Sequence, residues 1–415
     1  MKKLKQLGTF LQNNITHSDL VANCVISNQP VTKILDFGQH AYADTFVSED
    51  QLHLSEPVFP LQVYLNPESG SIQLGYVSSA KDRYNLYSYS YTSSNSQTAR
   101  NHWDEYAHTI KQRGHSGLVV EIGSNDGYLV GQFTPAVGVD SSAEMCALSQ
   151  AKGVNTVNAL FDNSVADAIK NKHGQAQVII ANNVFNHAND PVAFANSVAR
   201  LLSNTGEFVF EVPYWLSMVQ SGRFTDMVYH EHPTYFTVKM AWNLLQTAGL
   251  EITDFDIVDY HGGSLRVFAR LSTGATMPEK IQQAIEQETQ AGLFDVAFYQ
   301  GLQLKFEQSK IDWLSGFYKL LSEDPSAVVI GVGAAAKANT WLKWHGLDST
   351  VIHCITDASK HKQGKFTPLT RIPILGDEEF ANHKQPYALI LSWNISNGLR
   401  QAILNINPNT RFISQ

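Results

Sequence analysis

Residues 229–236 (sequence YHEHPTYF) place two imidazoles, one carboxylate and two phenols within a single short segment. A histidine side chain titrates near about 6.5, so it can accept a proton at neutral pH. We expect His232 to act as a general base that removes a proton from a carbon next to a carbonyl group. Glu231 would orient the imidazole, and Tyr229 would donate a hydrogen bond to the oxygen of the resulting enolate.

His187 follows an expected strand end, and we expect it to face the same cleft. Two alternatives exist for this histidine group. The rings could simply satisfy backbone partners in a loop. They could also bind a metal, but His230 and His232 would point in opposite directions in an extended segment, and the sequence offers no obvious third ligand.

A glycine-containing turn, residues 121–127 (EIGSNDG), follows an expected strand and precedes an expected helix. Glycine lets the backbone turn sharply and lets a ligand approach closely. Asp140 ends the next expected strand, where an acidic residue can accept hydrogen bonds from two ribose hydroxyls. These features favour S-adenosylmethionine over NAD, although a turn that only packs a helix on a sheet is the alternative. The expected contacts are Gly123, Asn125, Asp126, Gly127, Asp140 and Asn182.

A second turn, residues 331–336 (GVGAAA), fits the G-x-G-x-x-A pattern after a strand, and Asp357 follows the next strand. The pattern alone is compatible with an NAD site. A lysine at a helix N-terminus would equally hold the pyrophosphate of a nucleotide sugar, and the small alanines could serve packing alone. The expected substrate contacts here are Lys337, Asn339, Trp393 and Asn394.

The chain must position these residues with alternating strands and helices. Apolar runs separated by helix-length segments indicate a parallel sheet with ligands at the carboxyl ends of its strands. The first set of runs covers 118–122, 136–139, 178–181 and 206–212, and the second covers 327–332, 351–355 and 388–391.

Two other regions have different patterns. Residues 1–80 carry short alternating stretches broken by proline and glycine, which predicts a small β-rich module. Residues 278–322 are predicted to be helical and to form a connector that packs on a neighbour. Its apolar positions recur at steps of three and four residues: Phe298, Leu302, Phe306, Trp313, Phe317 and Leu320.

The overall composition limits the possible classes of protein. A chain of 415 residues exceeds the usual span of one hydrophobic core, so we expect two or three domains. The net charge of −8 is spread without long runs, which argues against a nucleic-acid groove. No apolar run is long enough to cross a bilayer, and no secretion signal is evident. We therefore expect a cytoplasmic protein with no membrane partner, as a monomer or small homo-oligomer.

At these motifs the chain resembles the sugar C-methyltransferases, best known as C-3 methyltransferases of nucleotide-linked 4-keto-6-deoxyhexoses. The resemblance spans nearly the whole chain and rests on residues 121–127, 229–232, 235–236, 261–266, 333–340, 361–365 and 392–394. It implies a base that matches His232, with Tyr229, Glu231 and His187 beside it. Within the matching motifs we also expect Ser264 and Arg266 to contact the substrate, together with one tyrosine of an earlier cluster, Tyr89 or Tyr91.

The resemblance implies an α/β chain of three domains. We expect a small β-rich module at 1–80, a central class I methyltransferase domain with a Rossmann-like fold at 81–277, and a C-terminal Rossmann-like domain at 278–415. The central domain would bind S-adenosylmethionine. The C-terminal domain, which includes the helical connector, would bind a nucleotide-diphosphate 4-keto sugar.

The N-terminal module departs from the family pattern. Family members resemble zinc modules there, with two C-x-x-C pairs, whereas the corresponding positions here are Cys24, Ser27, Asn66 and Ser69. A single thiolate cannot hold tetrahedral structural zinc. We therefore expect this module to fold without metal.

The expected reaction is methylation of the carbon beside the 4-keto group after His232 removes its proton. The carbons on both sides of the ketone, C-3 and C-5, are activated, and C-3 is favoured only by resemblance. Two alternatives remain: an NAD-dependent sugar oxidoreductase that uses the turn at 331–336, and a non-catalytic nucleotide-sugar binding protein.

Overall fold

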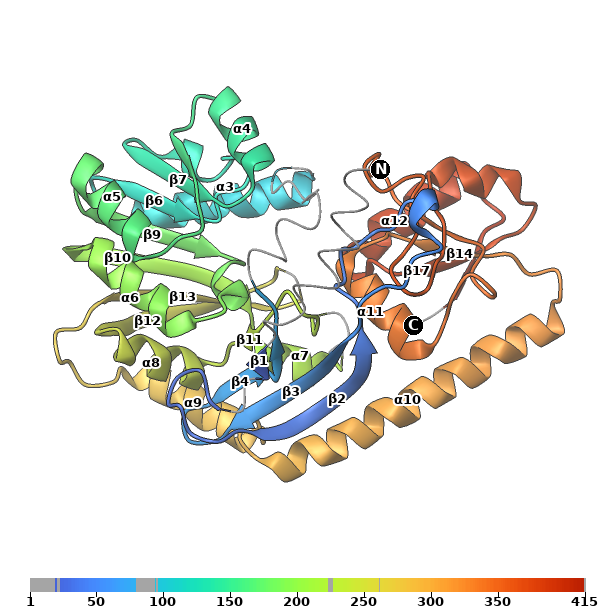
Figure 1. The fold of residues 1–415 in the computed structure, drawn as a ribbon, viewed down its shortest axis with the longest axis horizontal. Coiled ribbons are helices and arrows are strands. Elements are labelled where there is room, and N and C mark those ends of the chain that lie inside the picture. The colour runs from blue at the N-terminus through green and yellow to red at the C-terminus, as the bar shows by residue number, and fades with distance from the viewer. Residues whose placement is uncertain are drawn as a thin grey trace.

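The computed structural model describes residues 19–20, 23–79, 94, 96–222, 227–260 and 262–413. Two α/β units stand on either side of a small antiparallel sheet (Figure 1). A long helix, α10 (Val296–Glu323), runs along β2 (Thr32–His40) of that small sheet and reaches the C-terminal unit. Within the described residues, no helix combines the length and apolar character that crossing a bilayer requires.

The central unit is a seven-stranded sheet in the order β12-β13-β10-β9-β6-β7-β8. Its first five strands in the chain run parallel in the order 3-2-1-4-5, and β13 alone runs antiparallel to its neighbours. This is the strand order of class I methyltransferases, so the predicted central fold is confirmed. The strands are β6 (Val119–Ile122), β7 (Ala136–Asp140), β8 (Thr156–Asn158), β9 (Ala176–Asn182), β10 (Leu202–Pro213), β12 (Leu250–Val258) and β13 (Ser264–Leu271).

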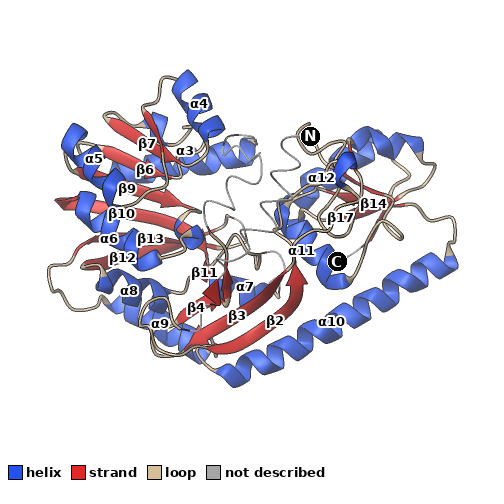
Figure 2. Ribbon diagram, viewed as in Figure 1, coloured by secondary structure: helices blue, strands red, loops and turns tan. Residues whose placement is uncertain are grey.

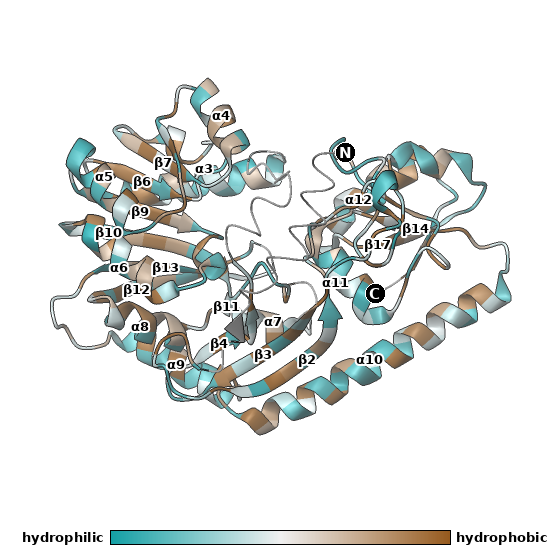
Figure 3. Ribbon diagram, viewed as in Figure 1, coloured by the Kyte–Doolittle hydropathy of each residue, from teal (hydrophilic) through white to brown (hydrophobic). Residues whose placement is uncertain are grey.

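The apolar runs of the sequence form the inner strands, which are buried on both faces, as a parallel sheet covered by helices requires. These strands are the largely brown ribbons in the left part of Figure 3. Several helices of this unit start at a side chain that caps the first turn, and Ser142, Asp162, Asp190 and Thr237 each accept a hydrogen bond from the backbone N–H three residues later. The helices are α3 (Gln97–Gln112), α4 (Ala143–Ala151), α5 (Asn163–His173), α6 (Pro191–Leu201) and α8 (Val238–Thr247).

The small sheet has the order β11-β4-β3-β2. Strand β3 (Phe59–Asn66) alternates buried and half-buried residues, as expected for a sheet with one face on a core. Strand β4 (Ser71–Leu74) pairs with β11 (Thr234–Tyr235), which comes from the acid/base segment much later in the chain. A further strand pair joins β1 (Asp19–Leu20) to β5 (Tyr76–Val77). The N-terminal region therefore holds the acid/base segment by direct strand pairing.

Residues 278–322 form two helices rather than one. Helix α9 (Glu279–Gln290) packs on α8 and β12, and its Ile281 and Ala284 belong to the core of the central unit. The apolar stripe of α10 divides between two cores. Phe298, Leu302 and Phe306 pack against the small sheet, whereas Trp313, Phe317 and Leu320 pack against the C-terminal unit. The connector thus ties the N-terminal sheet to the C-terminal unit.

The C-terminal unit is a five-stranded, fully parallel sheet in the order β16-β15-β14-β17-β18. Figure 2 shows two of its strands, β14 and β17, near α11 and α12. This is again the order 3-2-1-4-5, so the predicted second α/β unit is confirmed. Its strands are β14 (Val329–Val332), β15 (Cys354–Thr356), β16 (Ile374–Leu375), β17 (Tyr387–Ile390) and β18 (Arg411–Ile413), and its helices include α11 (Ala336–His345) and α12 (Ser396–Ile406).

Candidate active site

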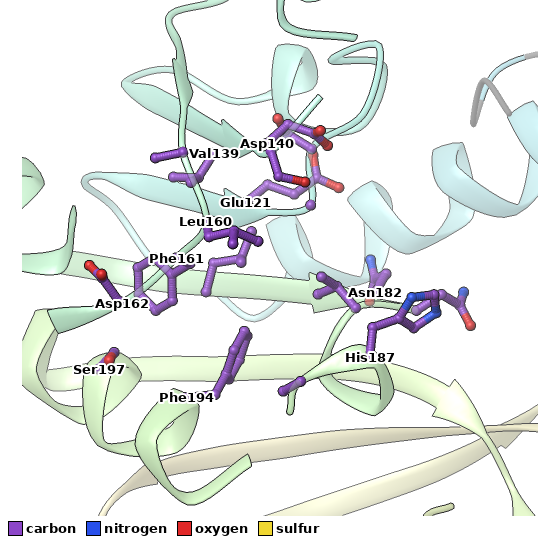
Figure 4. A pocket seen from close by; sticks show the side chains of 18 of the residues that line it. Glu121, Val139, Asp140, Leu160, Phe161, Asp162, Asn182, His187, Phe194 and Ser197 are labelled. Carbon is purple, nitrogen blue, oxygen red and sulfur yellow. The ribbon is translucent and has the colours of Figure 1, made fainter. Parts of the chain in front are cut away.

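A cavity of about 400 Å³ lies at the carboxyl ends of the central strands β6, β7 and β9 (Figure 4). Parallel sheets bind ligands at this edge. Polar groups at the strand ends face an otherwise apolar pocket, in which Figure 4 shows Asn182 and His187 at one end. The apolar wall includes Val139, Leu160, Phe161 and Phe194.

The turn after β6 brings the backbone close to its surroundings. Gly123 and Gly127 have φ values of 70° and 76°, in the left-handed region that favours glycine. A Cβ atom on Gly127 would lie 2.2 Å from Ser149 Oγ, and one on Gly123 would lie 3.0 Å from Val184 Cγ2. Both space and backbone conformation therefore require glycine at Gly127, and Gly123 itself lines the cavity.

Asp140 is fixed at the cavity wall by two backbone groups. Its Oδ2 accepts a hydrogen bond from the Asn125 N–H and its Oδ1 accepts one from the Ser142 N–H, both at 2.8 Å. Burial raises the pKa of Asp140, and these two hydrogen bonds oppose that shift. The carboxylate is thus held in one orientation at the edge of the sheet.

Two of the predicted contacts of this turn lie elsewhere. Asp126 accepts a hydrogen bond from Lys152 Nζ at 2.9 Å and another from Ser94, and neither Asp126 nor Gly127 lines the cavity. Asp126 therefore stabilises the turn through contacts outside the cavity. Gly123, Asn125, Asp140 and Asn182 do line the cavity, as the sequence predicted.

Asn182 presents an amide to the cavity. The Tyr106 hydroxyl is a hydrogen-bonding neighbour of this amide. An amide offers two donors and an acceptor, so it has further groups that a polar ligand in the cavity could pair with.

The base predicted from the sequence lies next to this cavity. His187 lines the cavity from the short 3₁₀ helix η4 (Phe185–His187), and its ring centroid is 4.8 Å from that of His232. The Tyr229 ring lies on another side of His232, with centroids 4.1 Å apart. The structure therefore brings these three predicted catalytic side chains together.

The tautomer of His232 follows from its backbone partner. Its Nδ1 lies 2.9 Å from the carbonyl oxygen of Met227, which can only accept a hydrogen bond. In the neutral ring Nδ1 must therefore carry the proton, so Nε2 is the basic nitrogen. The ring is only 4% exposed, which removes most of its contact with bulk water.

His230 contacts the N-terminal region. Its ring packs edge-on against three aromatic rings there, Tyr42, Phe59 and Tyr76, and its Nε2 lies 3.3 Å from the Pro60 carbonyl. His232 Nδ1 instead contacts the Met227 carbonyl, so the two histidines have different partners.

Glu231 connects the acid/base segment to the N-terminal region and, through it, to the C-terminal unit. Its Oε1 accepts a hydrogen bond from the Ala43 N–H at 3.1 Å, and the Ala43 carbonyl accepts one from Asn339 Nδ2 at 2.5 Å. Burial, and then the negative charge of Glu231, raises the pKa of Tyr229 well above its ordinary value. Tyr229 is therefore a neutral phenol that can donate a hydrogen bond.

The second glycine turn repeats the geometry of the first. Asp357 Oδ2 accepts from the Ala334 N–H and Oδ1 accepts from the Ser359 N–H, both at 2.8 Å. These are the same two types of contact that hold Asp140, at the equivalent position of an equivalent sheet. Gly333 has a φ of 93°, and a Cβ atom there would lie 2.2 Å from Ser392 Oγ.

Two lysines and a tryptophan lie around this second turn. Lys337 Nζ lies 5.1 Å from the centroid of the Trp393 ring, and Lys362 Nζ donates a hydrogen bond to the Ala334 carbonyl at 2.7 Å. A Cβ atom on Gly262, in the turn between β12 and β13, would lie 2.6 Å from Trp393 Cη2. Trp393 therefore lies where the C-terminal unit meets the central unit.

The structure places Ser264 and Arg266, two predicted substrate contacts, within the sheet and outside the cavity. The Ser264 hydroxyl donates to the Tyr260 carbonyl, and Arg266 is paired with Glu211 at 2.9 Å and lies over the Tyr106 ring. Both side chains are buried and neither lines the cavity, so they stabilise the sheet.

Three predicted contacts cannot be placed. Tyr89 and Tyr91 lie outside the described residues, as does the side chain of Asn394.

The four positions that correspond to a zinc module converge, but hydrogen bonds link them. Cys24 Sγ lies 3.1 Å from Ser69 Oγ and accepts from the backbone N–H of Ser27 at 3.4 Å. Ser69 Oγ in turn donates to Asn66 Oδ1 at 3.0 Å. One thiol, two hydroxyls and an amide do not fit the ligand set of structural zinc.

The sequence did not mark two other polar side chains near the acid/base segment. Asn186 in η4 and Thr234 in β11 are buried, and among the described residues the side-chain amide of Asn186 and the hydroxyl of Thr234 have no hydrogen-bond partner. Strand β11 and η4 are in contact. The one feature of the sequence that could have indicated Asn186 is its position directly before His187.

Comparisons with known proteins cover most of the chain. A family model described as a methyltransferase domain matches residues 98–254, and one described as a C-methyltransferase C-terminal domain matches residues 259–414. Among curated proteins, the C-methyltransferase NovU of Streptomyces niveus is 28% identical over 369 residues, which cover 87% of each chain.

Two similar solved structures each cover less than half of this chain. An S-adenosylmethionine-dependent methyltransferase from Clostridium acetobutylicum is 14% identical, with a TM-score of 0.35, over 46% of this chain and 96% of that one. The magnesium protoporphyrin IX methyltransferase of Synechocystis PCC 6803, solved with bound S-adenosylmethionine, is also 14% identical, with a TM-score of 0.32, over 42% of this chain and 79% of that one.

Proposed function

The chain belongs to the S-adenosylmethionine-dependent C-methyltransferases, and from that premise we propose that its substrate is a nucleotide-linked 4-keto-deoxysugar, methylated at C-3. The observation that carries this proposal is the contact between two imidazoles. His232, with Nε2 as its basic nitrogen, adjoins His187, which lines the cavity of the methyltransferase fold.

The cavity has the properties that a nucleoside cofactor requires. Its volume of about 400 Å³ is within the range of small-molecule sites, roughly 300–1,000 Å³. The Asp140 carboxylate would accept hydrogen bonds from the ribose hydroxyls, and the Asn182 amide would pair with a polar group. When bound, S-adenosylmethionine supplies an electrophilic methyl group on a sulfonium centre.

His232 would take the proton from the carbon beside the ketone. The Nδ1 proton stays in its hydrogen bond to the Met227 carbonyl, so Nε2 would accept the proton from the substrate. The electron pair of the broken C–H bond becomes the enolate, whose oxygen needs a hydrogen-bond donor. Tyr229, a neutral phenol next to His232, would be that donor. The enolate carbon would then bond to the methyl carbon as the methyl–sulfur bond breaks, and the electron pair of that bond would stay on sulfur, so that S-adenosylhomocysteine leaves.

The C-terminal unit would bind the nucleotide part of the substrate. The turn at Gly333 opens helix α11, whose N-terminus favours anions, and Lys337 stands in its first turn. The Trp393 ring next to Lys337 offers a surface for a base or sugar. The contact of Ala43 with both Glu231 and Asn339 links this unit to the base, which supports one substrate that spans both units.

A gain of one methyl group, detected by mass spectrometry, tests the proposal. The purified chain is incubated with S-adenosylmethionine and a panel of nucleotide-linked 4-keto-6-deoxyhexoses, and matched sugars without the keto group serve as controls. We expect a mass gain of one methyl group only on keto sugars, because only they acidify the neighbouring C–H bond. No methylation of any keto sugar would contradict the substrate assignment.

The repeated turn at Gly333 and Asp357 also fits an NAD-dependent sugar oxidoreductase. Titration with NADH separates this alternative from the proposal. A methyltransferase should bind S-adenosylhomocysteine and ignore NADH, whereas an oxidoreductase should bind NADH at the C-terminal unit.

A further inference from the structure

Two histidines and a glutamate meet on the C-terminal unit, outside the motifs that the sequence marked. One ligand atom from each of His353, Glu379 and His383 lies within 4.8 Å of the others. Both imidazoles use Nε2 to contact the same oxygen, Glu379 Oε1, at 3.3 Å for His353 and 2.8 Å for His383. The described residues contain no other such group of three.

These separations are close to those of a tetrahedral ion site. Nitrogen and oxygen ligands lie about 2.0–2.1 Å from zinc, so two ligands of a tetrahedral ion stand about 3.4 Å apart. The His353–Glu379 separation already has this value, and the His383–Glu379 separation needs to widen by about half an ångström. A set of two imidazoles and one carboxylate is also found in zinc sites that keep a fourth position for water.

The surrounding backbone holds the three residues in place. The His353 N–H donates to the Val329 carbonyl at 2.8 Å, immediately before β15. Asn407 Nδ2 donates to the carbonyl of His383 at 2.7 Å and to that of Phe380 at 2.9 Å, which anchors the end of the 3₁₀ helix η6 (Asp377–Asn382).

The other oxygen of the Glu379 carboxylate has its own hydrogen-bond partner. Asn382 Nδ2 donates to Glu379 Oε2 at 2.8 Å, so Oε1 is turned toward the two imidazoles. Groups that orient a ligand in this way commonly accompany metal sites. The His353 side chain is 46% exposed, so an ion and a water ligand can reach the group from solvent.

The cluster lies away from the reaction. His353 precedes β15, whereas Asp357 follows it, so the cluster is at the amino end of a strand whose carboxyl end carries Asp357, the residue that accepts a hydrogen bond from the second glycine turn. An ion here would join the start of β15 to the segment between β16 and β17. Its effect would be on the stability of the C-terminal unit.

We propose that His353, Glu379 and His383 form a structural Zn²⁺ site that links two segments at the amino edge of the C-terminal sheet. The site is separate from the N-terminal module, whose side chains do not fit zinc. It does not depend on the proposed sugar substrate, because it lies on the opposite edge of the sheet from the glycine turn.

Zinc titration of the full chain tests the site. The protein is stripped with a chelator, dialysed, and titrated with Zn²⁺ alone by calorimetry, and the melting temperature is recorded with and without the ion. We expect one zinc per chain and a higher Tm. His383→Gln and Glu379→Gln should each weaken zinc binding at least about tenfold and abolish the rise in Tm.

Two variants serve as controls. His173→Gln removes another exposed surface histidine, and Cys24→Ser removes the one thiol of the N-terminal module. Both should bind zinc as the wild type does. Metal-free Tm values that match the wild type would show that Glu379→Gln is folded. If the wild type shows no saturable zinc binding, or if Glu379→Gln binds as tightly, the three residues form only histidine–carboxylate ion pairs and the proposal is wrong.

Discussion

The rings of His187 and His232 lie with their centroids 4.8 Å apart, although the two residues come from different parts of the chain. His187 belongs to the central α/β unit and lines its cavity. His232 belongs to a segment that is paired through β11 with the N-terminal sheet, where Pro233 accepts a hydrogen bond from the Leu74 N–H at 2.8 Å. The N-terminal sheet therefore positions the proposed base beside the cavity of another unit.

Asp140 and Asp357 form a matched pair for mutation, because each accepts the same two backbone hydrogen bonds at 2.8 Å. Asp140→Ala should weaken S-adenosylhomocysteine binding about 10- to 100-fold, since hydrogen bonds to a charged group contribute about 1.5–3 kcal/mol. Asp357→Ala should leave that affinity unchanged and weaken binding of the nucleotide sugar. Calorimetric titration of both variants with both ligands measures this. Equal effects of the two variants on S-adenosylhomocysteine would contradict the assignment of separate sites.

Gly127 and Gly153 test whether the first turn requires glycine for space. Both have positive φ values, 76° and 82°, so alanine at either position costs roughly 1–2 kcal/mol of backbone strain. At Gly127 the added Cβ atom also meets Ser149 Oγ at 2.2 Å, whereas at Gly153 nothing lies within 4 Å.

Gly127→Ala should therefore lower the free energy of unfolding by more than Gly153→Ala does. Urea unfolding of both variants, followed by circular dichroism, gives the comparison. Losses of equal size would show that Ser149 moves aside and that only the φ angle requires glycine.

Glu288 should make stability depend on pH. It is fully buried, and burial raises its pKa from 4.5 to about 7, although hydrogen bonds from the Val238 N–H, the Lys239 N–H and the Tyr214 hydroxyl oppose the shift. The folded protein then holds this proton more tightly than the unfolded chain. Its stabilising contribution is fully present below pH 4.5 and is lost as the pH rises through about 7.

The size of this contribution is on the order of 3 kcal/mol, at about 1.4 kcal/mol per pKa unit. Denaturant unfolding between pH 4.5 and 8 measures it, and Glu288→Gln should flatten the profile in this window. Glu279→Gln, an exposed glutamate at the start of the same helix, should not. If Glu288→Gln keeps the wild-type pH dependence, the titrating group lies elsewhere.

The sequence predicted the two parallel sheets well, because long apolar runs between helix-length segments leave little choice of structure. The runs expected at 118–122 and 136–139 became β6 and β7 with nearly the same bounds. The two-residue strand β11 could not be predicted, because its existence depends on pairing with β4, far away in the chain. Short strands have no periodicity of their own.

The predicted site residues also differ in how far the sequence alone could place them. The positions of Asp140 at the cavity and of His232 beside it could be predicted, because one follows a strand and the other lies within a dense motif. Arg266 was assigned to substrate binding from its motif, yet it lies directly opposite Glu211 in the register of β10 and β13 and pairs with it. Such pairings depend on the register of the two neighbouring strands, which cannot be read from the sequence. The same holds for His353 and Glu379, which only the fold brings together.

Exchange of solvent deuterium into the substrate tests the role of His232 most directly, because it reports C–H cleavage without methyl transfer. The protein is incubated in D₂O with S-adenosylhomocysteine and a nucleotide-linked 4-keto-6-deoxyhexose, and deuterium at C-3 is measured by NMR. We expect the wild type to incorporate one deuterium there, and His232→Asn to do so about 10²- to 10⁴-fold more slowly while it still binds S-adenosylhomocysteine. Exchange at the wild-type rate in His232→Asn would show that another group is the base.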